Sequence, residues 1–236
     1  MSLMSLMSFM SFWSFTLLLC RKGVSMPKDF IPPHGGYKDL ISYQKAKIIY
    51  DATVYFCSRF IAQDKRTREQ MIQAARSGKQ NIVEGSLASG TSKQTELFLT
   101  GVAWSSLGEL LEDYEDYCRI NNIEEWGEDD PGRKRMRELN RIPKADYETF
   151  RKGIENEDPA VCVNVIVGLI KVTCYLLDQQ MKRMRKDLVE EGGLREKITR
   201  ARLEERERQR RAKREKDLKD RKDGKDIKDP KDRNCP

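Results

Sequence analysis

Residues 71–85 read MIQAARSGKQNIVEG, and this stretch decides how the chain folds. Helical spacing places small and apolar residues on one face of it, namely Met71, Ala74, Ala75, Gly78, Ile82 and Gly85. A glycine in a helix interior costs about 1 kcal/mol relative to alanine. The close approach of a neighbouring helix is the expected compensation. Gly78 and Gly85 therefore predict a tight seam between two helices.

Amphipathic helices are predicted on both sides of this stretch. Apolar residues recur at spacings of three, four and seven over residues 40–63 and 92–121. The linkers are short, and turns of that length force consecutive helices to run antiparallel. A fourth helix is expected to begin at residues 158–159, an Asp cap followed by Pro, and to end at the glycines 192–193. The predicted fold is all-α, an antiparallel up-and-down four-helix bundle with a charged C-terminal tail, helical and then disordered.

Turn and capping residues predict where these helices begin and end. Thr67, with Gln70 three residues later, is predicted to cap the helix that contains the glycines. Gly90 is predicted to end that helix in the left-handed conformation. Thr91 or Ser92 is expected to open the next helix.

The chain's charge is concentrated at its C-terminal end. The 236 residues include 45 basic and 38 acidic side chains, and residues 194–236 hold 18 of the basic and 11 of the acidic ones, so residues 1–193 carry 27 of each. We expect a low-complexity apolar leader over residues 1–36, the four-helix bundle over 37–193 and a charged tail over 194–236. The tail is predicted to be helical to about Glu215 and disordered beyond it.

The leader admits two interpretations. Residues 1–20 contain no charged side chain and repeat Met-Ser-Leu and Met-Ser-Phe, without a basic start or a small-residue cleavage site. One interpretation is that translation starts at Met26. The other is a single membrane anchor, and a membrane is expected as a partner only in that case.

The composition argues against an enzyme. The single histidine is His34, and none of the six cysteines forms a CxxC pair. Residues 77–80 read SGKQ and lack the Ser or Thr of a phosphate loop. We expect no metal and no cofactor, and Glu84 is the one residue to watch as a catalytic group. The unpaired cysteines favour a reducing, cytoplasmic location.

A basic stripe is the strongest candidate for a binding surface. Arg68, Ile72 and Arg76 follow one another at i,i+4, and Lys79 lies one turn beyond Arg76, over roughly 17 Å of helix. Such a stripe can bind phosphates and release their counterions. The candidate nucleic-acid-binding residues are Arg66, Arg68, Arg76 and Lys79. The alternative is an ordinary solvated face, or pairing with Glu69 and Glu84.

Several short motifs carry a family resemblance. They are YQKA at 43–46, QAARSGKQNIVEG at 73–85, SGTSK at 89–93, SSLGEL at 105–110 and LLEDY at 110–114. On these the chain resembles the four-helix-bundle family that includes proteins encoded in intervening sequences of bacterial ribosomal RNA genes, within it most of all the four helix bundle suffix domain proteins. The accessory variability protein of diversity-generating retroelements is similar. The resemblance implies a ring-shaped homo-oligomer and, for the retroelement member, a basic surface that binds nucleic acid and a reverse transcriptase.

These observations lead to a primary and an alternative hypothesis of function. The primary one is a non-enzymatic homo-oligomer that binds RNA, DNA or a ribonucleoprotein partner through the basic stripe. The alternative is a structural adaptor with no nucleic-acid role, whose acidic face over residues 112–116 meets a basic face of a neighbouring subunit or another protein.

Overall fold

The computed structural model describes residues 34–223. Every regular element in this range is a helix, so the described part of the chain is all-α. The expectations for residues 1–33 and 224–236 concern residues outside this range. The elements are η1 (Tyr37–Asp39), α2 (Ile41–Phe60), α3 (Lys65–Ala88), α4 (Lys93–Ile120), α5 (Pro131–Asn140), α6 (Tyr147–Ile154), α7 (Pro159–Glu191) and α8 (Leu194–Asp223).

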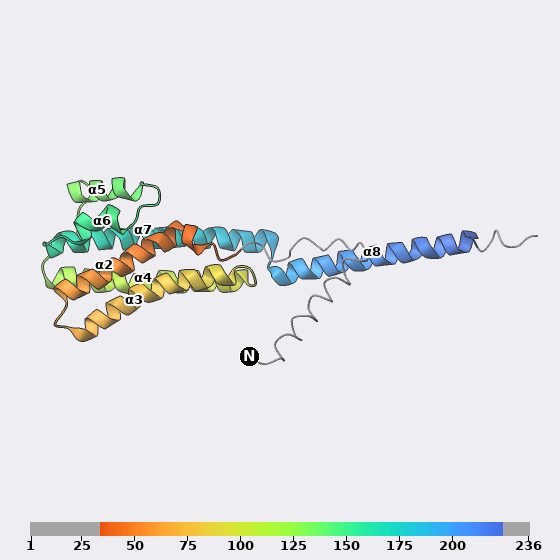
Figure 1. Ribbon diagram of the computed structural model, residues 1–236, viewed down its shortest axis with the longest axis horizontal. Helices are drawn as coiled ribbons and strands as arrows, with labels where there is room; N and C mark the ends of the chain where they lie inside the picture. The colour runs from red at the N-terminus through yellow and green to blue at the C-terminus, as the bar shows by residue number, and fades with distance from the viewer. Residues whose placement is uncertain (1–33, 224–236) are drawn as a thin grey trace, which may run out of the picture. The chain divides into compact units, whose positions relative to one another are not determined.

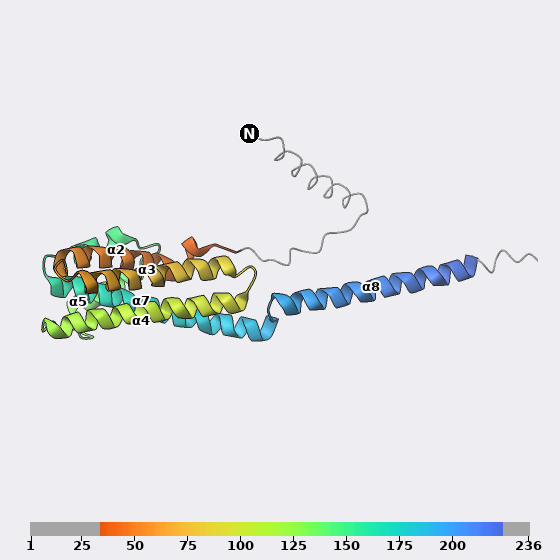
Figure 2. The same ribbon diagram turned by 90° about the horizontal axis from the view of Figure 1, so that it is seen from below.

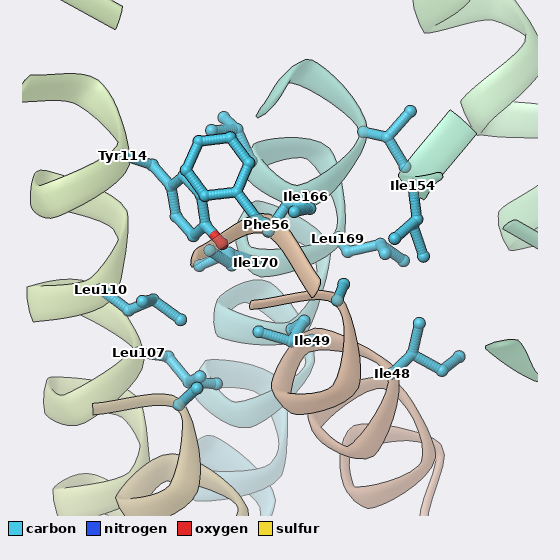
Figure 3. Packing of buried hydrophobic residues seen from close by; sticks show 14 of the residues in the cluster. Ile48, Ile49, Phe56, Leu107, Leu110, Tyr114, Ile154, Ile166, Leu169 and Ile170 are labelled. Carbon is cyan, nitrogen blue, oxygen red and sulfur yellow. The ribbon is translucent and has the colours of Figure 1, made fainter. Parts of the chain in front are cut away.

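Four long helices pack around one core. Helices α2, α3, α4 and α7, hereafter the packed helices, lie side by side in both views (Figures 1 and 2). Helices α2 and α4 each contact both α3 and α7. In the core, the ring centroids of Phe56 and Tyr114 lie 5.1 Å apart, and both rings lie next to Ile166 and Ile170 of α7 (Figure 3). The Tyr114 hydroxyl donates a hydrogen bond to Thr53, so its burial leaves no unsatisfied polar group.

The seam predicted at the two glycines lies between α3 and α4. Gly78 is buried, and a Cβ added there would lie 2.7 Å from Cδ2 and 2.8 Å from Cγ of Leu107. At Gly85 an added Cβ would lie 3.3 Å from the carbonyl oxygen of Glu96. The predicted close approach of a neighbouring helix is confirmed, because α4 occupies the space that a side chain at Gly78 would need.

Two of the predicted helix ends are wrong. Asp64, and not Thr67, caps α3: its carboxylate accepts a hydrogen bond from the Thr67 backbone N–H at 3.0 Å. A charged acceptor at a helix N-terminus is favoured by the helix dipole, which explains the earlier start at Lys65. Gly90 does not have a positive φ. Its small size instead admits the ring of His34, since an added Cβ would lie 2.7 Å from the His34 Cγ atom.

Three other predicted ends are confirmed. Ser92 caps α4 and accepts a hydrogen bond from the Thr95 N–H. Asp158 caps α7 and accepts one from the Ala160 N–H at 2.8 Å. Gly192 ends α7 with φ of 72°, the left-handed region in which glycine is unstrained.

The segment between α4 and α7 contains two short helices, α5 and α6. A short helix is expected after Pro143, and α6 is that helix, but α5 precedes it. Its signal is Asp130 followed by Pro131, the same cap-and-proline pair that opens α7; the Asp130 carboxylate accepts a hydrogen bond from the Gly132 N–H. Helix α5 packs on α7, and α6 packs on α2 and α7 (Figure 1).

Side chains of α7 hold the start of this segment against the packed helices. The buried amide of Asn164 donates to the carbonyl of Glu124 at 3.0 Å and accepts from the Trp126 N–H at 2.8 Å. The Lys171 ammonium lies 2.7 Å from a carboxylate oxygen of Glu125 and 3.3 Å from one of Glu115. The acidic residues of the segment are therefore partly neutralised within the chain.

Helix α8 continues past the predicted end of the helical tail. It reaches Asp223, eight residues beyond Glu215. The repeated Lys-Asp pairs of this part place opposite charges four residues apart, as in Lys216 with Asp220 and Asp217 with Arg221. Such pairs each stabilise a solvated helix by about 0.2–0.5 kcal/mol, which explains the extension.

Length and composition alone would let the apolar part of α7 cross a membrane. However, 56% of that part is buried inside the structure. A core helix of a soluble protein has the same composition, and packing against α2 and α4 accounts for the apolar character of α7.

The seam generates a test of stability. We expect Gly78→Ala to destabilise the protein by about 1–3 kcal/mol, because the new methyl group overlaps the buried Leu107 side chain. Gly108→Ala is the matched control, since an added Cβ there meets nothing within 4 Å, and it should stabilise by up to about 1 kcal/mol. Urea unfolding followed by circular dichroism measures both. A Gly78→Ala variant as stable as the Gly108→Ala variant would contradict the tight seam.

Candidate nucleic-acid interface

Three of the four predicted binding residues share one side of α3. At 3.6 residues per turn, Arg68, Arg76 and Lys79 fall within about 80° of the helix circumference. This side adjoins α2, because Lys79 contacts Tyr50 of α2 and the charge of Arg68 acts on Cys57 of α2. The three residues are hereafter the α3 stripe.

An aromatic ring of the neighbouring helix positions one of these cations. The Lys79 ammonium lies 4.0 Å from the centroid of the Tyr50 ring. A cation over an aromatic face is stabilised by about 0.5–1 kcal/mol at a partly exposed site. The ring therefore restricts where the ammonium can lie, and Lys79 as a whole is partly exposed. The motifs did not indicate Tyr50, because its partner is 29 residues away in the sequence.

The thiol next to the α3 stripe, Cys57, is buried. Burial raises the pKa of Cys57 to about 12, although the positive charge of the half-buried Arg68 acts in the opposite direction. The Cys57 sulfur lies 3.9 Å from the sulfur of Met71. It behaves as a small core residue, as the apolar pattern around it indicates.

No carboxylate of the described residues forms an ion pair with the α3 stripe. The carboxylate of Glu69 instead pairs with Lys65 at 3.8 Å, and no ion pair involves Glu84 within residues 34–223. The alternative in which Glu69 and Glu84 neutralise the stripe is thus not seen in the structure. The positive charge of the stripe remains available to an external anion.

The fourth predicted residue lies elsewhere on α3. Arg66 lines an open groove of about 520 Å³ between α3 and α4, together with the carboxylates of Glu69, Glu109 and Asp113. The pKa of Asp113 is raised, first by burial and then by the negative charges of Asp116 and Glu109. The structure therefore separates Arg66 from the α3 stripe, in surroundings unfavourable to phosphate.

The acidic face proposed for an adaptor is partly neutralised. Glu115 pairs with Lys171, and Asp116 pairs with Arg119 at 2.6 Å. Glu112 is exposed, and within the described chain it forms no ion pair. Fewer carboxylates of this acidic face are therefore free to bind a basic partner than the sequence indicates.

A buried lysine is the charged group that sequence reasoning missed. Lys45 is 5% exposed and faces the core side of α2. Its ammonium donates a hydrogen bond to the side-chain oxygen of Asn140 and lies 5.6 Å from the centroid of the Phe150 ring. Burial lowers the pKa of Lys45. The sequence pattern does indicate that Lys45 is buried, because position 45 shares a helix face with the apolar Ile48 and Ala52.

Lys45 predicts a pH dependence of stability. Because the pKa is lower in the folded state than in the unfolded chain, the unfolded state binds more protons over the interval between the two values. Stability therefore rises with pH as Lys45 loses its proton in the folded protein. We expect the unfolding free energy of the wild type, relative to a Lys45→Met variant, to increase from pH 7 to pH 10.

Urea unfolding at several pH values measures this difference. Lys47→Met, which removes an exposed lysine of the same helix, corrects for the general effect of losing one positive charge. The unfolding free energy of the wild type relative to Lys45→Met could instead stay constant or fall with rising pH. Either result would show that the buried ammonium is not destabilised by its surroundings.

Neither metal-binding clusters nor relatives identify a function. Among residues 34–223, no group of three or more His, Cys, Asp or Glu side chains could hold a metal ion. Comparisons with protein-family models, with curated proteins and with solved structures find no match for this chain.

Proposed function

We propose that this chain is a non-enzymatic, homo-oligomeric four-helix bundle that binds RNA, another nucleic acid or a ribonucleoprotein partner through the α3 stripe. Short linkers between α2, α3 and α4, and contacts of α2 and α4 with both α3 and α7, support an antiparallel up-and-down arrangement. The family resemblance implies the same fold and a homo-oligomer and, for the retroelement accessory variability protein, a basic surface that binds nucleic acid.

The observation that carries the proposal is the uncompensated charge of Arg68, Arg76 and Lys79. These cations lie on one side of α3, over roughly 17 Å, without an ion pair from the described residues. A span of this length can contact several phosphates of one strand. Each phosphate contact would release condensed counterions, which makes the affinity depend on salt.

Oligomerisation would raise the affinity of a binding surface as small as the α3 stripe. Three phosphate contacts alone give weak binding. A ring of identical subunits would present one α3 stripe per subunit, and linked sites raise the effective concentration of each further contact. Light scattering on the full chain tests this part of the proposal: a mass of several subunits is expected, and a monomer at all concentrations would contradict it.

Neutralising the stripe tests the proposed activity. In the Arg68→Gln, Arg76→Gln, Lys79→Gln triple variant, we expect binding to a fluorescein-labelled single-stranded RNA of 20 nucleotides to weaken by about tenfold or more at 50 mM KCl. The slope of log affinity against log salt should become shallower by about 2, at about 0.7 per contact. Fluorescence anisotropy measures both quantities.

The matched control neutralises three exposed cations of the α5–α6 region, Arg137, Arg141 and Lys152, also as glutamines. It removes the same charge and should change the affinity by less than about threefold, because no contact is lost. If both triple variants lost the same affinity for RNA, the loss would follow from net charge alone and not from the α3 stripe. Absence of RNA binding by the wild type at 50 mM salt would favour the adaptor hypothesis, with Glu112 and its neighbours as the contact surface.

A further inference from the structure

Residues 208–214 of α8 read RQRRAKR, with five cations and no acid. Acidic side chains are interleaved with basic ones on both sides of this segment, hereafter the basic run. Every residue from Arg202 to Arg221 is exposed. The basic run is therefore the most concentrated positive charge on α8, and it is accessible from all around the helix.

The cations of the basic run occupy two sides of the helix. At 3.6 residues per turn, Arg210, Lys213 and Arg214 fall within about 100° of the circumference, and Arg208 and Arg211 fall within about 60° on another side. The α3 stripe, on one side of its helix, can follow only one phosphate strand. A helix with cations on two sides can contact two strands at once, as happens inside a groove.

The surroundings of the basic run exclude two other common targets of basic helices. Between residues 204 and 217 the only apolar side chain is Ala212. A helix that lies on a membrane inserts an apolar face among the lipids. A helix that binds in the groove of a regulatory protein needs large apolar anchors at i, i+3, i+4 and i+7. Neither feature is present, whereas phosphates require only the cations.

We propose that the basic run binds in the major groove of duplex DNA, with its two sets of cations on the phosphates of the two strands. An α-helix with its side chains is about 10–12 Å across. The major groove of B-form DNA is about 12 Å wide and admits such a helix, whereas the major groove of A-form RNA is too narrow. The shape of the site therefore selects duplex DNA over duplex RNA.

The helix that carries these cations is formed before any ligand binds. Arg208 pairs with Glu205 at 3.1 Å, and Gln209 donates a hydrogen bond to the same carboxylate. Glu207 and Glu215 lie four residues on either side of Arg211, the spacing that supports a solvated helix. Binding therefore does not require the segment to fold, which removes a common cost of association. Exposed ion pairs such as Arg208 with Glu205 are weak and are readily exchanged for phosphate contacts.

This site lies on a different helix from the α3 stripe, and neither site depends on the other. The experiment measures anisotropy of full-chain protein with a labelled 20-base-pair DNA duplex, an RNA duplex of the same sequence and the single-stranded RNA used above. The first variant replaces all five cations of the basic run with glutamine, which has a helix propensity close to that of lysine and arginine. Circular dichroism verifies that α8 remains helical.

The matched control replaces five cations of α8 outside the basic run with glutamine, namely Arg195, Arg200, Arg202, Lys216 and Lys219. Both variants lose the same charge from the same helix. We expect the basic-run variant to lose at least 100-fold in affinity for duplex DNA at 50 mM KCl. Its slope of log affinity against log salt should become shallower by about 4.5, at about 0.9 per phosphate contact for five contacts. The control should lose less than about fivefold.

Three results would overturn the inference: equal losses in the two α8 variants, a basic-run variant that loses as much affinity for duplex RNA as for duplex DNA, or binding to anionic phospholipid vesicles without binding to DNA. The α3-stripe variant is measured on the same duplexes. If it binds duplex DNA like the wild type and also binds single-stranded RNA like the wild type, the proposed function fails while the α8 site stands. If only the stripe variant loses binding, the α8 site fails while the proposed function stands.

Discussion

The contact between Gly78 of α3 and Leu107 of α4 is the constraint on which the rest of the structure depends. Leu107 occupies the position that a side chain at residue 78 would need, so α3 can approach α4 only with this face turned inward. The same face carries Met71 and Ile82 into the core. Because α3 is oriented in this way, the cations of the α3 stripe cannot enter the core. Lys79 lies at the border with α2, where Tyr50 is its neighbour.

Helix periodicity and capping chemistry predicted most of the fold, because both are local. The small face of α3, the Asp158 cap and the turn at Gly192 require only nearby residues to recognise. The role of Gly90 could not be predicted, because it depends on His34, which lies far from it in the sequence. Helix α5 was not predicted, although Asp130 followed by Pro131 is the same signal that placed the start of α7 correctly.

The candidate site was only partly predictable for a related reason. Spacing along α3 correctly placed Arg68, Arg76 and Lys79 on one side, and it also shows that Arg66 lies on another. What spacing cannot give is the identity of the neighbouring helix on each side. The structure supplies it: α2 brings an aromatic ring to the stripe, and α4 brings the carboxylates Glu109 and Asp113 to the groove of Arg66. The acids of the α4–α7 segment, by contrast, are partly neutralised by Lys171.

A double-mutant cycle between positions 78 and 107 tests the central constraint most directly. Leu107→Ala removes the side-chain atoms that an alanine at 78 would overlap, at its own cost of about 2–5 kcal/mol. The close packing of α3 on α4 predicts that Gly78→Ala costs at least about 1 kcal/mol less in the Leu107→Ala background than in the wild type. Unfolding free energies that add within about 0.5 kcal/mol would contradict it, because the two positions would then not share the same space.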